Sequence, residues 1–459
     1  MAISNKRSYP TKAYIFVIVE RFLARETHSG VFLFGATIAA MVWTNSPWFG
    51  SYFELWHTSL GIEFGSHIVD LSLIHWINDA LMALFFLLIG LEIKRELLVG
   101  ELSSPRKAAF PIVAAIGGIL LPALIYFIVN LQPDGQTNGF GIPMATDIAF
   151  AMGFLLILGK RVPVILKVFI VSLAIVDDLG AVIIIALFYS NSIELAYLGY
   201  AIIPLAILIL LNVTGIRKLW PYLVTGVMLW IMFELSGIHA TIAGVILALT
   251  IPLRSRINPQ QFLALCRTEL SIFKECELER KNILLTSEQQ NALEAVEDAY
   301  GAVQNPLVRL EHRLHPISAF LVMPLFALAN AGVQISGVNI SLLVPTNLGI
   351  ILGLMVGKPM GIIGFTYLAN RLGWVKKPDN LSWKHIVGAG VLAGVGFTMS
   401  LFISHLAFTE LSMIESAKVA ILICSLVMGL SGTAFLFWVS RHGGQADSTR
   451  NGMQDNKNQ

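Results

Sequence analysis

Long apolar stretches with almost no charge dominate this sequence and restrict it to a membrane fold. A helix needs roughly 20 residues to cross a bilayer, and about twelve windows meet or approach that length. They lie near 30–49, 74–98, 108–130, 141–159, 163–189, 195–214, 219–236, 238–252, 315–335, 347–370, 385–407 and 416–439. The hydrophobic fraction of 56% and the mean hydropathy of +0.73 agree with this interpretation. We therefore predict an all-α integral membrane protein.

The distribution of lysine and arginine predicts the orientation of these spans. Basic residues fall in the N-terminal segment (1–29), in every second loop, and just before or within the tail (441–459). The loops between them contain no lysine or arginine, with Lys418 as the lone exception on that side. By the positive-inside rule, both termini lie in the cytoplasm. The net charge of +2 is too small to indicate nucleic acid as a partner.

Two stretches depart from the pattern of spans. Near 55–72, alternating β-branched residues interrupted by glycine predict a small outer hairpin, whose edge could pair with a second copy. An ordered loop without a partner is the alternative.

Residues 253–312 form a cytoplasmic insertion between the spans of 30–252 and those of 313–440. Within it, the charge-rich stretch 255–306 predicts two amphipathic helices, which form either a solvated hairpin or a surface for a partner.

Two adjacent acids, Asp177 and Asp178, lie in the middle of the otherwise uncharged run VFIVSLAIVDDLGAVIIIALFY. A carboxylate near the centre of a bilayer costs roughly 2.5–3.5 kcal/mol on insertion scales, so such residues usually have a function. Binding a cation or transferring a proton is the leading interpretation, because a packing role does not explain the burial of two acids.

Two other spans are predicted to be interrupted. The fourth reads GIPMATDIAFAMG, and Pro143 removes a backbone hydrogen bond just before Thr146 and Asp147. The eleventh, VGAGVLAGVGFTMSLF, is rich in glycine. The two spans run in opposite directions and occupy corresponding positions in spans three to five and ten to twelve. This arrangement predicts an inverted repeat with a binding site near the middle of the membrane.

The tenth span contains Lys358, a buried cation that needs a carboxylate or a helix C-terminus nearby. A purely structural Lys–Asp pair is one interpretation, but one lysine cannot neutralise three acids. The oxygens of Asp177, Asp178 and Thr146 suit a hard cation such as Na⁺ or Li⁺. Burial favours the protonated form of a carboxylate, so protons and cations would compete for the same oxygens. A conformational switch between the two faces would turn that competition into exchange.

A second cluster of titratable residues lies at the cytoplasmic ends of the second and ninth spans, in GLEIKREL and RLEHRLHP. Histidines and paired carboxylates can change charge between pH 5 and 8, so the cluster could respond to pH. Ordinary salt bridges at helix ends are the simpler interpretation, and spacing alone favours them. His239, at the outer end of the eighth span, is by the same standard a satisfied polar group.

Together these segments resemble the NhaA-type bacterial Na⁺/H⁺ antiporters. The resemblance rests on IGLEIKREL, PMATDIAFA, SLAIVDDLGAVIIIALFY, GIHATIAGV, RLEHRLHP, MPLFALANAGV, VGKPMGI and GVGFTMSLFI, which cover nearly every span in order. It implies a multi-pass protein of the bacterial inner membrane that is not an enzyme and uses no cofactor. It also implies electrogenic exchange of two protons inward for one Na⁺ or Li⁺ outward, and a homodimer joined partly through the outer hairpin.

The resemblance assigns roles to individual residues. Asp177 and Asp178 would bind Na⁺ and protons, with Lys358 as the salt-bridge partner of Asp177. Thr146 and Asp147 would lie where the interrupted helices cross, and Asp147 would offset facing positive helix ends. The pH-sensing set would comprise Glu92, Arg95, Glu96, His239, Glu311, His312 and His315. The insertion 255–306 is longer than expected for the family and lies just before Glu311, His312 and His315, so the pH set-point is the implied property that it most puts in doubt.

Two other classes of membrane protein compete with an antiporter. An intramembrane aspartyl protease needs two facing carboxylates on separate helices, about a hydrogen bond apart and activating one water. The adjacent pair Asp177-Asp178 does not provide this arrangement, and no Tyr-Asp and Gly-x-Gly-Asp pairing occurs in the sequence. A passive cation channel would conduct Na⁺ without moving protons, whereas a carrier couples the two flows.

Overall fold

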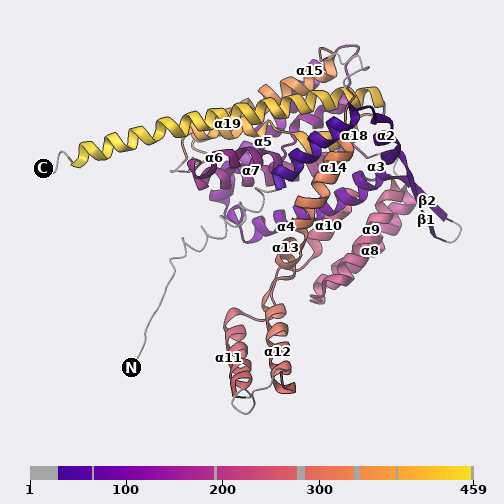
Figure 1. Ribbon diagram of the computed structural model, residues 1–459, viewed down its shortest axis with the longest axis vertical. Coiled ribbons are helices and arrows are strands. Elements are labelled where there is room, and N and C mark those ends of the chain that lie inside the picture. Colours follow the sequence, from indigo (N-terminus) through magenta and orange to yellow (C-terminus); the bar gives the residue numbers. More distant parts are fainter. Residues whose placement is uncertain are drawn as a thin grey trace. The chain divides into compact units, whose positions relative to one another are not determined.

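The computed structural model describes residues 29–64, 67–190, 194–275, 285–334, 342–378 and 381–455. Nearly all of the expected N-terminal segment (1–29) lies outside the described residues, as does 276–284 of the insertion. Helices make up most of the described chain, and the only strands among the described residues form one two-stranded sheet. Figure 1 shows their arrangement.

The apolar helices correspond to the windows predicted from the sequence. In the described part of the chain, nine helices are long and apolar enough to cross a membrane: Leu73–Leu98, Pro105–Val129, Thr137–Leu158, Val164–Phe188, Leu195–Val213, Leu219–Ser236, Pro306–Asn330, Pro345–Arg371 and Leu411–His442. A bent pair, Trp383–Ala393 with Phe397–Ala407, and two shorter apolar helices, Ser29–Thr44 and Thr241–Thr250, account for the remaining windows. The predicted fold class, an all-α membrane protein with interrupted helices, is confirmed.

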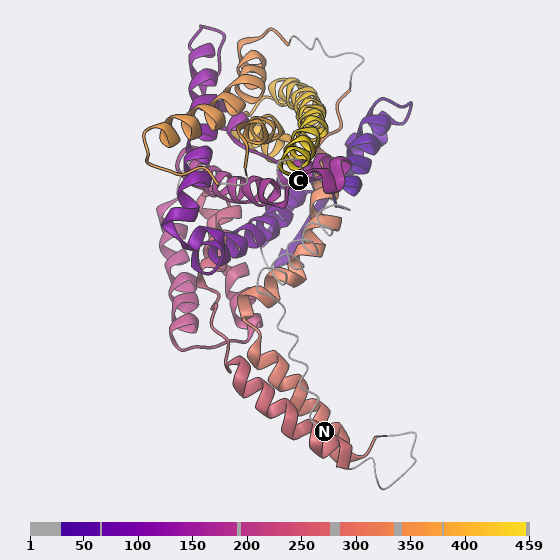
Figure 2. The same cartoon turned by 90° about the vertical axis from the view of Figure 1, so that its left-hand side faces the viewer.

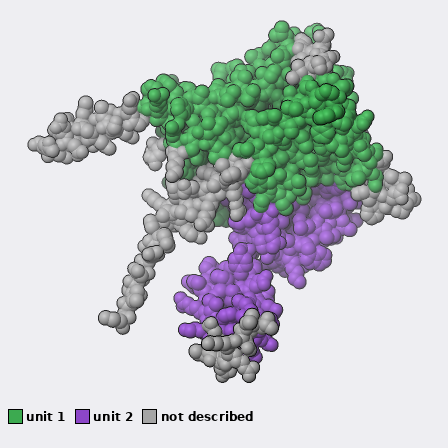
Figure 3. Space-filling view, viewed as in Figure 1, with its two compact units in different colours: residues 1–85, 96–192, 316–459 green, residues 86–95, 193–315 purple. Residues whose placement is uncertain are grey.

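The chain divides into two compact units, coloured separately in Figure 3. Unit 1 comprises Met1–Phe85, Glu96–Ser192 and Pro316–Gln459, and unit 2 comprises Phe86–Arg95 and Ile193–His315. Three of the four boundaries between them fall within helices α4 (Met82–Leu98) and α13 (Pro306–Ile317).

Unit 1 contains the helices that follow the third to fifth and the tenth to twelfth predicted windows. The elements of unit 1 include α2 (Phe49–His57), β1 (Ser59–Phe64), β2 (His67–Ser72), α3 (Leu73–Trp76), η1 (Ile77–Leu81), η2 (Glu101–Ser103), α5 (Pro105–Val129), η3 (Thr137–Met144), α6 (Ile148–Leu158), η4 (Gly159–Arg161), α7 (Val164–Phe188), η6 (Ser318–Val322), α14 (Met323–Asn330), α15 (Pro345–Leu352), η7 (Gly353–Gly357), α16 (Lys358–Arg371), α17 (Trp383–Ala393), α18 (Phe397–Ala407) and α19 (Leu411–Asp455). β1 and β2 are antiparallel, with Ser59 opposite Ser72, and lie within the stretch predicted as a hairpin.

Helices α5 and α16 cross at a pair of glycines. A Cβ atom on Gly361 would overlap the carbonyl oxygen of Gly117, and one on Gly117 would overlap the carbonyl oxygen of Gly361. Only glycine permits such a close approach of two backbones, as is common between membrane helices. This crossing fixes the start of α16, where Lys358 lies one turn before Gly361.

Both predicted helix interruptions are present in unit 1. In the fourth span, the 3₁₀-helix η3 contains Pro143 and ends at Met144, and α6 starts at Ile148. In the eleventh span, α17 ends at Ala393 and α18 starts at Phe397, with a bend of 44° between them. Because the backbone between the two halves of each span is not helical, its polar groups are available to partners other than the helix itself.

Unit 2 is built around helices α8 (Leu195–Val213), α9 (Leu219–Ser236) and α10 (Thr241–Thr250). Their core contains Leu208, Tyr222 and Leu229, together with Leu307 and Leu310 of α13. The insertion consists of α11 (Pro259–Glu275) and α12 (Ser287–Val303), which lie side by side in Figures 1 and 2. The second of these helices begins with a capping box in which Thr286 and Gln289 bond reciprocally, at the position that the sequence indicates.

Candidate functional site

The two interrupted helices meet at their breaks. The backbone N–H of Asp147 donates to the carbonyl of Val395 at 2.7 Å, and the hydroxyl of Thr146 donates to the carbonyl of Ala393 at 3.0 Å. Ser400 of α18 donates its hydroxyl to the carbonyl of Ile142 in η3 at 2.8 Å. Polar groups released by the breaks therefore pair with the opposite helix, as buried backbone requires.

Asp147 caps two helices at once. Its Oδ1 accepts the backbone N–H of Phe150 at 2.9 Å, which makes it the N-cap of α6. Its Oδ2 accepts the backbone N–H of Thr398 at 3.0 Å and the Thr398 hydroxyl at 2.5 Å, in the first turn of α18. The N-terminus of a helix has a partial positive charge, so one carboxylate faces the positive ends of both half-helices.

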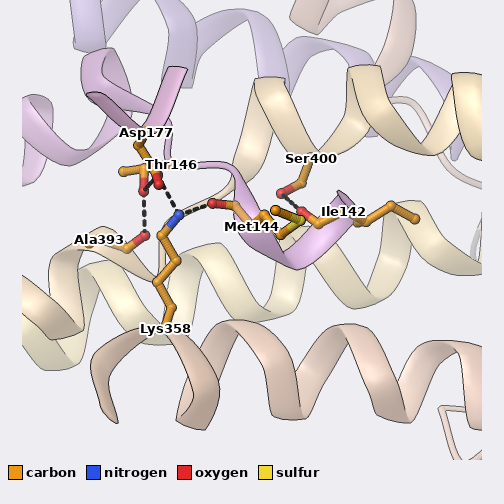
Figure 4. A network of polar contacts seen from close by, with 7 residues as sticks. All are labelled: Ile142, Met144, Thr146, Asp177, Lys358, Ala393 and Ser400. Carbon is orange, nitrogen blue, oxygen red and sulfur yellow. Dashed lines mark hydrogen bonds and ion pairs between the residues drawn. The ribbon is translucent and has the colours of Figure 1, made fainter. Parts of the chain in front are cut away.

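Lys358 occupies the opposite side of the crossing. Its side chain is fully buried, forms an ion pair with Asp177 and donates to the carbonyl of Met144, the last residue of η3 (Figure 4). A helix C-terminus has a partial negative charge. The ammonium is therefore neutralised by a carboxylate and by the end of a helix, which are the two partners expected from the sequence.

Asp177 connects α7 to both neighbouring elements. Its Oδ2 accepts from Lys358 and also from the hydroxyl of Thr146, at 2.7 Å (Figure 4). Its Oδ1 is buried and has no hydrogen-bond partner among the described residues. A buried carboxylate oxygen without a donor is costly, so this atom can accept a proton or bind a cation.

Asp178 follows on the same helix and is only 2% exposed. It interacts electrostatically with Lys358, although successive residues of a helix point about 100° apart. Asp177 and Asp178 thus lie near one lysine, Asp147 lies at the same crossing of the interrupted helices, and all three acids are buried. The buried site contains more carboxylates than cations, as the sequence predicts.

Sequence reasoning missed Thr398 and Ser400. Both lie in the apolar stretch GFTMSLF, and their side chains bond to the other interrupted helix. Hydroxyl side chains within membrane helices usually bond to their own backbone, which is why the residue type alone did not identify them. Their position three and five residues after Val395, in a span predicted to be interrupted, was the available signal.

The second cluster assembles in part, within unit 2. Arg95 of α4 donates through Nε to both carboxylate oxygens of Glu311, at 3.0 and 3.1 Å, and Glu311 is buried. Nearby, Nδ1 of His315 lies 3.8 Å from a carboxylate oxygen of Glu92. Four of the seven predicted residues therefore form one contact between α4 and α13.

The other three predicted residues have different surroundings. Glu96 accepts the backbone N–H of Glu101 at 2.9 Å, and His312 is exposed. His239 lies in the turn before α10, whereas Lys94 of α4 contacts the carbonyls of Leu249 and Ile251 at the end of α10. The ten residues of α10 separate the two places by about 15 Å.

Buried ionisable residues at the crossing of two discontinuous membrane helices define the site of a secondary transporter. Comparison with protein families agrees: the family described as Na⁺/H⁺ antiporter 1 matches residues 20–436. The chain belongs to this family and is a multi-pass membrane protein.

Several bacterial proteins named Na⁺/H⁺ antiporter NhaA are similar to this chain over most of their length. The protein of Wolinella succinogenes is 50% identical over 423 residues, which cover 92% of this chain and 93% of the relative. That of Helicobacter pylori strain G27 is 50% identical over 430 residues, covering 93% and 97%. A protein of Helicobacter hepaticus named Na⁺/H⁺ antiporter NhaA 2 is 46% identical over 417 residues, covering 90% and 94%.

Proposed function

We propose that this chain is a Na⁺/H⁺ antiporter of the bacterial inner membrane, which exports Na⁺ or Li⁺ in exchange for protons. The observation that supports this most directly is the excess of buried carboxylates at the crossing of the interrupted helices, where Asp177 and Asp178 interact with Lys358 and Asp147 joins the two breaks. Membership of an antiporter family supports the same function.

The proposed cation site consists of Asp178 and Asp177, with Thr146 as a further oxygen donor. Na⁺ and Li⁺ prefer oxygen ligands. The Oδ1 of Asp177 has no donor in the described chain, so it can turn to a cation without breaking a hydrogen bond. Its Oδ2 is held by Lys358 and Thr146. In this proposal Asp178 is mainly the cation ligand and Asp177 mainly the proton carrier.

The charges of the site favour electrogenic exchange. With Asp147, Asp177, Asp178 and Lys358 all ionised, the site has an excess of two negative charges. One Na⁺ leaves a single negative charge, whereas protons on Asp177 and Asp178 leave none. Exchange of two protons for one Na⁺ then moves one net charge per cycle, and a membrane potential contributes roughly 2.3 kcal/mol per 100 mV. The Na⁺-loaded form and the protonated form therefore leave different net charges beside the helix ends.

We further propose that the contact between α4 and α13 regulates exchange by pH. Glu311 forms an ion pair with Arg95 and also interacts electrostatically with Glu92 and His315. Protonation of Glu311 would remove the charge that holds Arg95, and protonation of His315 would strengthen its attraction to Glu92. Histidine is the side chain that commonly changes charge between pH 5 and 8, so the packing of α4 against α13 would depend on pH.

The proposal places both termini in the cytoplasm, as the charge pattern predicts, and joins two copies through β1 and β2. A two-stranded sheet has two unpaired edges, which favour addition of a strand from another chain. Deleting 59–72 should therefore convert a dimer into a monomer on native electrophoresis, and an unchanged dimer would refute this interface.

The antiport activity can be tested in everted vesicles acidified by respiration, with a fluorescent pH indicator. Added Na⁺ or Li⁺ should collapse the pH gradient in vesicles that contain the wild-type protein. Asp178→Asn should abolish the response, whereas Asp134→Asn, which changes an exposed acid in an outer loop, should leave it intact. A gradient that persists with protein confirmed in the membrane would refute the proposal, and Na⁺ entry without proton movement would indicate a channel.

A further inference from the structure

A large basic cavity lies in unit 2, and its lining includes none of the buried carboxylates described above. Its volume is about 1170 Å³, and its walls come from the turn between α8 and α9, the end of α12 and the first turns of α13. Five permanently charged cations line it: Arg217, Lys218, Arg256, Arg309 and Arg313. Glu297 and Asp298 are its only acidic lining residues, so three positive charges are left uncompensated.

The cations of this cavity have no partner among the residues that the structure describes. Among the described residues, none of the five side chains forms an ion pair or a hydrogen bond. Nη1 of Arg217 and Nε of Arg309 are moreover buried without a hydrogen-bond partner. A buried guanidinium donor that is unsatisfied is costly, and the protein meets that cost at two places in the same cavity.

We propose that this cavity binds a soluble anion with two or more phosphate groups. Arginine recognises phosphate through paired charge-assisted hydrogen bonds, and the guanidinium groups of Arg217 and Arg309 have no hydrogen-bond partner among the described residues. The excess of three positive charges exceeds what one phosphate group neutralises at pH 7. The lining also offers Tyr300 and the backbone of 301–305, so the cavity has room for more than a single phosphate.

A soluble ligand fits better than a lipid headgroup, because the insertion forms one wall. Helix α12 is polar and is not among the helices that could span a membrane. Its two acids, Glu297 and Asp298, would oppose a negatively charged membrane surface, whereas a small anion can approach the arginines of α13 from the solvent. This inference does not depend on the antiport activity.

Binding can be measured with purified full-length protein in nanodiscs of phosphatidylcholine, by titration calorimetry with inorganic triphosphate at low salt. The wild type should bind triphosphate more tightly than orthophosphate, and salt should weaken binding. Arg309→Gln and Arg217→Gln should each weaken it about ten-fold or more. Arg267→Gln, which changes an exposed arginine of α11 outside the cavity, should have no effect.

Glu297→Gln provides a test that misfolding cannot imitate, because it should tighten binding by removing a repulsive charge. Failure of triphosphate to bind, or equal weakening by Arg267→Gln, would overturn the proposal. Chemical modification of Arg309 gives a second readout. If nanodiscs containing anionic lipid protect Arg309 from modification and triphosphate does not, the cavity binds a lipid headgroup and the proposal is overturned. Thermal unfolding of each variant checks that it is folded.

Discussion

Asp147 accepts both the backbone N–H and the hydroxyl of Thr398, from the other interrupted helix. The two residues are 251 positions apart, yet they join the N-termini of α6 and α18 through one carboxylate. Without that charge, two positive helix ends would face each other in a buried site. The contact therefore fixes the crossing on which Lys358 and Asp177 depend.

Replacing Thr398 should weaken the crossing. Thr398→Val keeps the shape of the side chain but removes a hydrogen bond to a charged group, which should cost about 1.5–3 kcal/mol. Thr398→Ser should retain most of the stability. Thr433→Val is the matched control, because its hydroxyl bonds only to Gly429 within α19. Thermal unfolding in detergent measures the difference, and equal stability of the Thr398 and Thr433 variants would contradict the account.

The ion pair between Lys358 and Asp177 should show strong coupling. Lys358→Met leaves a buried carboxylate without its cation, and breaking such a pair typically costs about 3–5 kcal/mol. In the double variant Lys358→Met/Asp177→Asn, the uncompensated charge is gone, so most of the stability should return. Exchange should stay lost, since Asp177 is the proposed proton carrier. Additive losses of stability would show that the two side chains do not interact.

The glycine crossing of α5 and α16 should tolerate no side chain. Gly361→Ala places a methyl group against the backbone of Gly117, which cannot move aside as a side chain can. Overpacking of this kind should cost about 1–3 kcal/mol. Gly364→Ala, three residues later on the same helix, meets nothing within 4 Å and should be neutral or slightly stabilising. If both variants unfold at the same temperature, the close crossing is not present in the membrane.

The contact between α4 and α13 should determine the pH profile of exchange. Gln at position 311 has the shape of a protonated glutamate, so Glu311→Gln should mimic the low-pH form at every pH. The profile should therefore lose most of its dependence on pH, because position 311 no longer changes charge. Glu101→Gln, which alters an exposed ion pair with Lys107, should not shift it. An unchanged profile for Glu311→Gln would restrict this contact to a structural role.

The membrane spans and the charged centre of the site could be predicted from the sequence. Long apolar windows identify the membrane spans directly. An acid or a lysine in the middle of such a window indicates a functional site, because it is so costly to bury. Pro143 and the glycines of the eleventh span likewise indicated the interruptions before their geometry was known. That Lys358 pairs with an acid followed from the expectation that opposite charges pair, whereas the choice of Asp177 and the place of Asp147 came from the resemblance to the family.

Contacts between distant segments could not be predicted in the same way. Thr398 and Ser400 act through the helix that they face, and hydroxyl side chains give no sign of their partner. The seven residues proposed as a pH sensor share a chemistry, but only the fold separates His239 from Glu311. The basic cavity arises because three segments between 215 and 313 converge, and each of them alone is an ordinary basic stretch.

The most direct test of the account measures both flows at once in proteoliposomes. With purified protein, an outward Na⁺ gradient should drive proton uptake, and a membrane potential that is negative inside should accelerate it. Asp178→Asn should abolish both the Na⁺ flux and the proton flux, while Asp134→Asn should preserve them. Na⁺ flux without proton movement, or full exchange in Asp178→Asn, would contradict the claim that buried aspartates couple the two ions.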